Sequence, residues 1–241
     1  MHDSDHNHLH EEHLRFFGRM TASLSHDINN VFSTINELAG LIHDLDALAL
    51  QGDRIAPDKI RSLTERISAQ VGRGEILIRQ LNRFAHAIDV PFVTFDARNM
   101  LEEVVALGRR HAERRGYCVV FASPDDSINI HANLFAMQHL VHACIDLLFD
   151  PAAAEKVITA SLHRTTGGAT IVLQGPPLPG TLQAAPGSLT FIRALAESLA
   201  ISLDMAANGR RVITLCVPGS FNGQAPGGIE PQQLPVKKAP C

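Results

Sequence analysis

A heptad repeat near the N-terminus constrains the fold of this chain more than any other feature. With Leu14 at heptad position a, the a and d positions up to Leu45 are all apolar except Thr21. A 3-4 repeat of this fidelity is typical of helices that pack in a coiled coil or a bundle. The stripe is widened beyond a two-helix seam by Met20, Phe32, Leu41 and Leu48. This width favours a four-helix bundle.

A second apolar stripe follows a break at 51–53, and Pro57 marks the expected start of its helix. Gly72 and Gly74 lie inside this stripe, and each costs roughly 1 kcal/mol relative to Ala, so packing must offset that cost or the helix bends. Two helices of about 30 residues form an antiparallel hairpin. A lone hairpin cannot bury two wide stripes, so we predict a homodimer in which two hairpins form a four-helix bundle.

From Pro91 onward the pattern changes to mixed helices and strands. Asp96 is the expected N-cap of a helix that Gly116 ends, and Gly167-Gly168 and Asn208-Gly209 are expected turns. The strands are predicted near 93–95, 117–122, 157–162, 170–173, 201–205 and 211–217, and the helices near 97–115, 133–149 and 188–200. Together they predict an α/β two-layer sandwich.

The chain is therefore expected to have four parts. They are a His-rich leader (1–11), a helical hairpin (12–90), an α/β domain (91–218) and a disordered tail rich in Gly and Pro (219–241). Three histidines near the N-terminus, His6, His10 and His13, could share a helical face that suits Ni²⁺, Cu²⁺ or Zn²⁺. A solvated leader is the favoured interpretation, because no second shell of orienting residues is evident.

Composition excludes several classes of function. The net charge of −4, the absence of Trp and the single Tyr argue against a nucleic-acid binder. No stretch is long and apolar enough to predict a membrane span. The four Cys form no CxxC motif, which fits a reducing cytoplasm. We therefore expect a cytoplasmic protein without membrane or nucleic-acid partners.

The candidate site is the string Ser25-His26-Asp27-Ile28-Asn29-Asn30 in the middle of the first helix. His26 falls at heptad position f, away from the seam, and Asn30 lies one turn further on the same face. A carboxylate such as Asp27 can hydrogen-bond one ring nitrogen and leave the other as a nucleophile. An amide at the position of Asn30 can place a phosphoryl group or a water. Taken alone, an ordinary solvated helix face is the simpler interpretation of these residues.

The wider segment FFGRMTASLSHDINNVFSTI resembles the phosphoacceptor box of bacterial two-component histidine kinases, in its HExxN and HDxNN variants. The second helix ends in IRQLNRFA, which is similar to the RQLLxFS ending of that family's dimerisation hairpin, and 95–116 resembles the first strand and helix of its ATP-binding domain. The resemblance covers about residues 12–218. It implies a HisKA-type phosphoacceptor hairpin followed by a GHKL ATPase-like sandwich. It also implies His26 as phosphoacceptor, Asp27 as its orienting acid/base and Asn30 as the residue that positions the phosphoryl group or water.

Three departures concern the family's conserved motifs. Val31 stands where HExxN members carry a proline, although HDxNN members also lack it. The family's metal-binding asparagine falls on Leu147, which has no oxygen for Mg²⁺. The aspartate of the DxGxG motif falls on Gln174, and its glycines are replaced by prolines and Leu178.

The remaining departures are a GxGL turn replaced by Pro186-Gly187-Ser188-Leu189 and a lid reduced to 180–187. Together these changes remove the metal ligand, the base-reading residue and the phosphate cradle, so we expect a degenerate domain with no ATP cofactor of its own.

The sequence most favours a histidine phosphotransferase that relays a phosphoryl group between His26 and receiver aspartates. Its partners are response-regulator receiver domains or a hybrid histidine kinase, and the receiver supplies the Mg²⁺. The resemblance is strongest to dimeric histidine phosphotransferases. A divergent sensor histidine kinase that still uses ATP, and a pseudokinase adaptor that only binds a partner, remain as alternatives. Outside this site, the arginine pairs Arg109-Arg110 and Arg114-Arg115 are interpreted as a solvated helix face, with contact to an acidic partner as the alternative. His139 and His142 are interpreted as packed or boundary residues.

Overall fold

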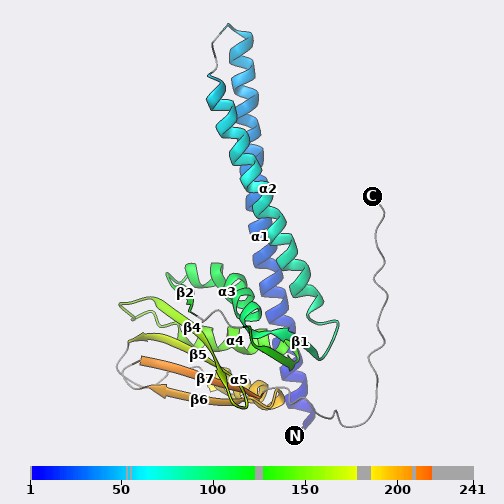
Figure 1. The fold of residues 1–241 in the computed structure, drawn as a ribbon, viewed down its shortest axis with the longest axis vertical. Coiled ribbons are helices and arrows are strands. Elements are labelled where there is room, and N and C mark those ends of the chain that lie inside the picture. The colour runs from blue at the N-terminus through cyan, green and yellow to red at the C-terminus, as the bar shows by residue number, and fades with distance from the viewer. Residues whose placement is uncertain are drawn as a thin grey trace.

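The computed structural model describes residues 2–52, 54, 56–122, 127–177, 186–207 and 210–218. A long helical hairpin rises from a mixed helix-and-sheet part (Figure 1). The predicted tail at 219–241 and the predicted Asn208-Gly209 turn lie outside the described residues. No helix in the described part of the chain has the length and apolar character needed to cross a membrane.

The hairpin consists of α1 (His2–Leu50) and α2 (Pro57–His86). The seam of this hairpin follows the heptad repeat: the d residues Leu24, Val31, Leu38 and Leu45 are all buried. Leu38 and Leu45 pack with Leu63 of α2 near the closed end of the hairpin. Gly72 and Gly74 lie within one continuous α2, so the glycines do not end the helix.

The first helix is longer than the sequence predicted. It has 49 residues and begins at His2, so residues 2–11 continue the helix in place of a separate leader. Leu9 packs against the core of the mixed part, and the ring of His8 lies edge-on to Phe191 at 6.4 Å. The extra turns of α1 are therefore held by contacts that the heptad pattern does not contain.

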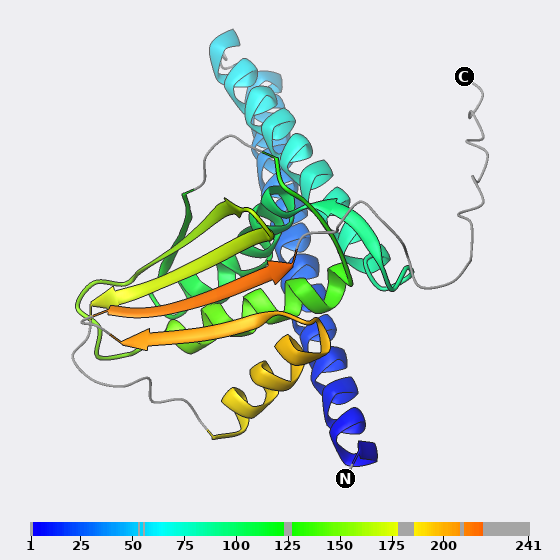
Figure 2. The same cartoon turned by 60° about the horizontal axis from the view of Figure 1, so that its bottom comes forward.

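The mixed part contains a five-stranded sheet with strand order β2-β4-β5-β7-β6. The β2–β4 pair is parallel and the other pairs are antiparallel. Its strands are β2 (Cys118–Phe121), β4 (Val157–Thr165), β5 (Gly168–Pro177), β6 (Ser202–Ala207) and β7 (Arg210–Pro218). Three helices cover one face of this sheet (Figure 2): α3 (Ala97–Glu113), α4 (Leu134–Leu148) and α5 (Pro186–Ser198). The predicted mixture of helices and strands is confirmed.

Local signals explain where the helices of this part begin and end. The Asp96 carboxylate accepts from the Arg98 backbone N–H at 3.0 Å, and the Asn133 side chain accepts from the Ala136 N–H at 2.9 Å. Gly116 follows α3 with a φ of 75°, the left-handed conformation that favours glycine. A small sheet that the sequence did not predict pairs β1 (Val93–Asp96) with β3 (Asn129–Ala132). Four residues are too few to give β3 a clear alternating pattern.

An aromatic cluster joins the hairpin to the mixed part. Phe16 of α1 is 1% exposed, and its ring lies 5.6 Å from both Phe84 of α2 and Phe135 of α4. Met20 and Leu107 are buried in the same cluster. Because Leu107 belongs to α3, this packing places α3 alongside the middle of α1, where His26 lies.

Candidate functional site

The structure brings together two of the three predicted site residues. His26 lies in the middle of α1 with 52% of its side chain exposed, as its f position predicts. The side-chain amide of Asn30, one turn further along, lies 3.0 Å from Nδ1 of His26. This spacing allows a hydrogen bond whose direction depends on the imidazole tautomer.

Asp27 takes a different partner from the one the sequence predicted. Its Oδ1 lies 4.0 Å from Nδ1 of His26, which is too far for a hydrogen bond. The same oxygen accepts from Nη1 of Arg110 at 3.1 Å. Asp27 therefore contacts α3 through Arg110.

Arg110 is the residue of this site that the sequence analysis missed. Its Nη2 lies 2.9 Å from Nε2 of His26, and its Nη1 contacts Nδ1 of the same ring. Only 29% of its side chain is exposed, so the interpretation of Arg110 as part of a solvated face is wrong. The sequence signal that could have found it is the apolar face of α3 around Leu107, which is buried against the hairpin and carries Arg110 to α1.

Two cavities flank the contact between His26 and Arg110. The first has a volume of about 310 Å³, and its lining includes Arg19, Ser23, His26, Arg110 and Arg114. The second, of about 680 Å³, lies on the side of Asp27 and Asn30. Arg110 lines both cavities. The imidazole of His26 lines the first, basic cavity, whereas the second cavity is lined by both arginines and carboxylates.

A buried histidine cluster lies on the other side of Phe16. The His139 ring stacks on Phe16 with centroids 4.3 Å apart, and its Nδ1 lies 2.9 Å from Nδ1 of His13. Burial lowers the pKa of His139 to about 2 and that of His142 to about 4. Both rings are therefore neutral near pH 7, in agreement with their interpretation as packed residues.

Asp146 connects this cluster to α3. Its Oδ1 lies 3.0 Å from Nε2 of His111, and its Oδ2 lies 3.6 Å from Nδ1 of His142. Burial alone would raise the pKa of Asp146, but the His111 hydrogen bond and nearby positive charges outweigh burial and lower it. Among the described residues, no group of three or more His, Cys, Asp or Glu side chains is arranged to hold a metal ion.

The positions that align with a nucleotide site do not fit a metal-bound nucleotide. Leu147 offers no oxygen ligand, and the neighbouring Asp146 carboxylate faces His111. Gln174 and Gly175 lie within the strand β5 and not in a loop. A Cβ at Gly175 would lie 3.2 Å from Leu148 Cδ2, because the helix packs directly against the strand there.

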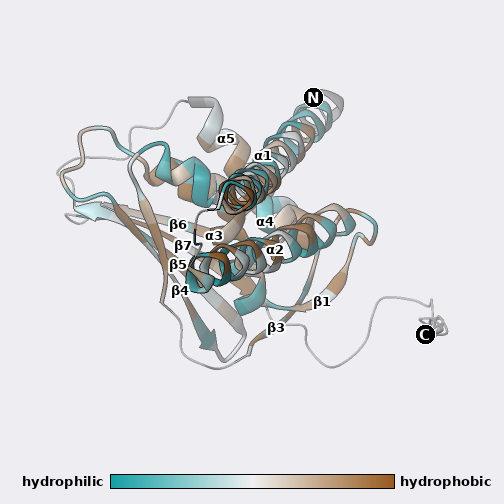
Figure 3. Cartoon of the chain, turned by 90° about the horizontal axis from the view of Figure 1, so that it is seen from above, coloured by the Kyte–Doolittle hydropathy of each residue, from teal (hydrophilic) through white to brown (hydrophobic). Residues whose placement is uncertain are grey.

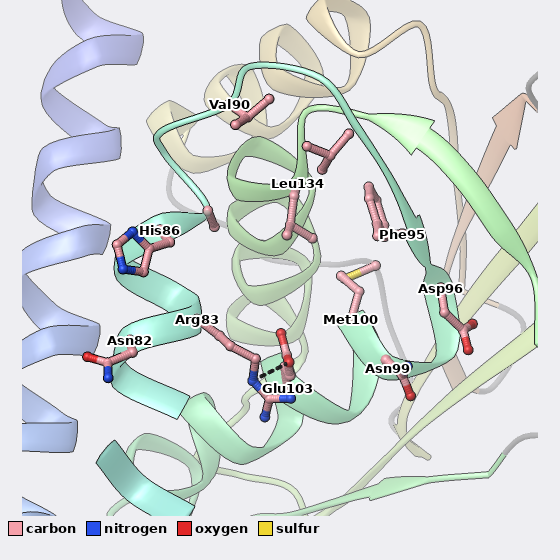
Figure 4. A pocket seen from close by; sticks show the side chains of 12 residues that line it. Asn82, Arg83, His86, Val90, Phe95, Asp96, Asn99, Met100, Glu103 and Leu134 are labelled. Atoms are coloured by element: carbon pink, nitrogen blue, oxygen red, sulfur yellow. Dashed lines mark ion pairs between the residues drawn. The ribbon is translucent and has the colours of Figure 1, made fainter. Parts of the chain in front are cut away.

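A further cavity of about 430 Å³ lies where α2 meets the mixed part (Figure 4). Its apolar wall includes Phe95, Met100 and Leu134. Across it, Nε of Arg83 lies 3.0 Å from Oε1 of Glu103, an ion pair between α2 and α3. Burial raises the pKa of Glu103, and the charge of Arg83 opposes that rise. This ion pair is a second link that fixes α3 beside the hairpin.

No protein-family description matches the chain, and no curated protein sequence matches it. Several solved structures resemble it. The nucleotide-free catalytic domain of histidine kinase ThkA has 12% identity and a TM-score of 0.45, over 54% of this chain and 97% of that one. Acinetobacter baumannii histidine kinase AdeS has 13% identity and a TM-score of 0.45, over 79% and 98%. ThkA in complex with response regulator protein TrrA has 16% identity and a TM-score of 0.45, over 87% and 64%.

Proposed function

We propose that this chain is a histidine phosphotransfer protein of a two-component pathway, in which His26 accepts a phosphoryl group from one receiver aspartate and passes it to another. The observation that carries the proposal is the imidazole of His26, half exposed on an uninterrupted helix with Asn30 3.0 Å from Nδ1. In-line transfer needs an accessible nucleophile on a rigid element, and the middle of α1 offers both.

The chemistry asks little of the protein beyond positioning. The Nε2 lone pair attacks phosphorus as the receiver's acyl phosphate bond breaks, and the aspartate oxygen leaves with the electron pair of that bond. Nδ1 must then carry the ring proton. The side-chain oxygen of Asn30 can accept a hydrogen bond from Nδ1–H when the amide is turned over. In this proposal Asp27 supports the site from a distance of 4.0 Å and orients Arg110.

Several features support phosphoryl transfer without an ATP site in this chain. Leu147 carries no oxygen ligand, and the Gln174–Pro177 stretch lies in β5 instead of forming a loop. In this proposal the receiver domain supplies the Mg²⁺. The protein acts in the cytoplasm, as a homodimer joined through its hairpins. The mixed part then serves to dock the receiver next to His26.

The decisive experiment is phosphotransfer to the full chain. Receiver domains from the source genome, phosphorylated with acetyl phosphate, are mixed with wild type, His26→Ala and His43→Ala. His43 is a matched control because it is an exposed histidine of the same helix. We expect label on wild type and His43→Ala and none on His26→Ala.

The same assay separates the alternatives. Label on His26 from ATP alone would establish a histidine kinase and overturn the ATP-independent relay. Receivers that bind wild type and His26→Ala equally, without labelling either, would establish a binding adaptor.

A further inference from the structure

We propose that Arg110 and the cavity beside it form a phosphoryl-binding site for phosphorylated His26. This inference rests on the proposed function of His26 and goes one step further. The hairpin carries the nucleophile, and α3 of the mixed part supplies the cation that holds the transferred group. Neither part alone then contains the complete site.

The geometry places the cation where the new bond forms. Nη2 of Arg110 lies 2.9 Å from Nε2 of His26, in the region that phosphoryl oxygens occupy once Nε2 is phosphorylated. A guanidinium has donors and no acceptor, so Arg110 can hydrogen-bond only a ring nitrogen that holds a lone pair, and it contacts both ring nitrogens of His26. The contact between Nη1 of Arg110 and Oδ1 of Asp27, at 3.1 Å, anchors the guanidinium from its other side.

The charge around the contact suits a phosphoryl group. The adjoining cavity of about 310 Å³ is lined by Arg19, Arg110 and Arg114, and its described lining contains no carboxylate. In the part of the chain that the structure describes, neither Arg19 nor Arg114 has a carboxylate within ion-pair distance. A phosphoryl group carries close to two negative charges at pH 7, and guanidinium groups bind it with two parallel hydrogen bonds. Among the described residues, Arg110 pairs with Asp27, while Arg19 and Arg114 bring the cavity positive charge without a carboxylate at ion-pair distance.

Arg110 has to move during transfer. In the unphosphorylated protein it faces the Nε2 lone pair, and attack on the acyl phosphate requires that lone pair to be free. As the N–P bond forms, the guanidinium exchanges its contacts with both ring nitrogens of His26 for contacts with the phosphoryl oxygens and keeps its hydrogen bond to Asp27. The aspartate oxygen of the receiver leaves with the bonding pair, and the ring proton remains on Nδ1. No further reactant is needed.

The test uses phosphoramidate, a small phosphodonor that releases ammonia and needs no receiver. The full-length wild type, Arg110→Ala, Arg110→Lys and the matched control Arg109→Ala are compared for the initial rate of His26 labelling. We expect a loss of about tenfold or more in Arg110→Ala, a smaller loss in Arg110→Lys and a rate within about twofold of wild type in Arg109→Ala. Unfolding midpoints measured in parallel identify any variant that fails to fold.

A second readout reports direct contact. The side-chain Nε–H resonance of Arg110, assigned by its loss in Arg110→Lys, should shift when wild type is phosphorylated and stay unchanged when His26→Ala is treated identically. Labelling of Arg110→Ala at or above the wild-type rate, or an Arg110 resonance that does not respond, would overturn this inference while leaving the role of His26 intact. Failure of phosphoramidate and of every receiver to label wild type would instead refute the proposed function itself.

Discussion

At the scale of single residues, the buried histidines couple the packing of the protein to pH. His139 is 1% exposed and stacks on Phe16, so burial penalises its charged form and lowers its pKa from 6.5 to about 2. An unfolded chain binds a proton at this residue below about pH 6.5, whereas the folded protein does not until about pH 2. The buried, neutral His139 therefore costs the folded protein nothing above about pH 6.5, and the free energy of unfolding decreases as the pH falls below that value.

Replacing His139 should flatten this pH dependence. His139→Phe keeps a ring against Phe16 and removes the titrating group. Between pH 7.5 and 5.5, we expect the variant to lose about 1 kcal/mol less free energy of unfolding than wild type, because one fewer proton is taken up on unfolding. Urea unfolding at the two pH values measures the difference. The exposed His43→Gln should change as wild type does, and identical slopes for wild type and His139→Phe would refute the argument.

At the scale of elements, the seam of the hairpin could be predicted from the sequence, but its docking could not. The d residues from Leu24 to Leu45 are buried as the heptad repeat requires. Phe16, at position c, is buried as deeply because α4 covers it. A periodicity within one helix cannot show which other element will cover such a residue.

The same limit explains how much of the candidate site could be predicted. The pairing of His26 with Asn30 follows from helical spacing alone. The contact of Arg110 with His26 joins residues 84 positions apart, and it depends on the placement of α3 by Leu107 and the Arg83–Glu103 ion pair. The apolar face of α3 around Leu107 indicates that this helix packs against something, but a single sequence does not show that its partner is α1.

Two glycines of α2 give a matched test of hairpin packing. A Cβ added at Gly72 would meet no atom within 4 Å, whereas one added at Gly74 would lie 3.3 Å from Cγ1 of Val31. Gly72→Ala should therefore raise the free energy of unfolding by up to about 1 kcal/mol through helix propensity. Gly74→Ala should gain less, because Val31 must shift. Urea midpoints compare the two, and an equal gain at both positions would contradict the close approach of α2 to α1 at Val31.

At the scale of the whole molecule, the hairpin leaves apolar side chains exposed along both helices. Hydrophobic residues, coloured brown, recur along the ribbons of α1 and α2 (Figure 3). Phe32 of α1 is 55% exposed and Val71 of α2 is 47% exposed, while their own seam is already filled. The other large exposed apolar residues of the hairpin are Leu14, Leu41, Leu48, Leu50, Ile60, Ile76 and Ile78. Monomeric proteins rarely expose apolar surface over such a length, so these positions favour the four-helix bundle of a homodimer.

Charges placed on this surface should separate the two chains. We expect wild type to have the mass of two chains at micromolar concentration in light scattering, and Phe32→Glu or Val71→Glu to shift the equilibrium toward one chain, because a carboxylate is costly to bury without a partner. Val157→Glu is the matched control, since Val157 is 40% exposed on β4 in the mixed part, away from the hairpin. A wild-type mass equal to one chain would rule out the dimer. Dissociation by Val157→Glu alone would instead place the interface on the sheet, and the exposed hairpin stripe would then need another partner.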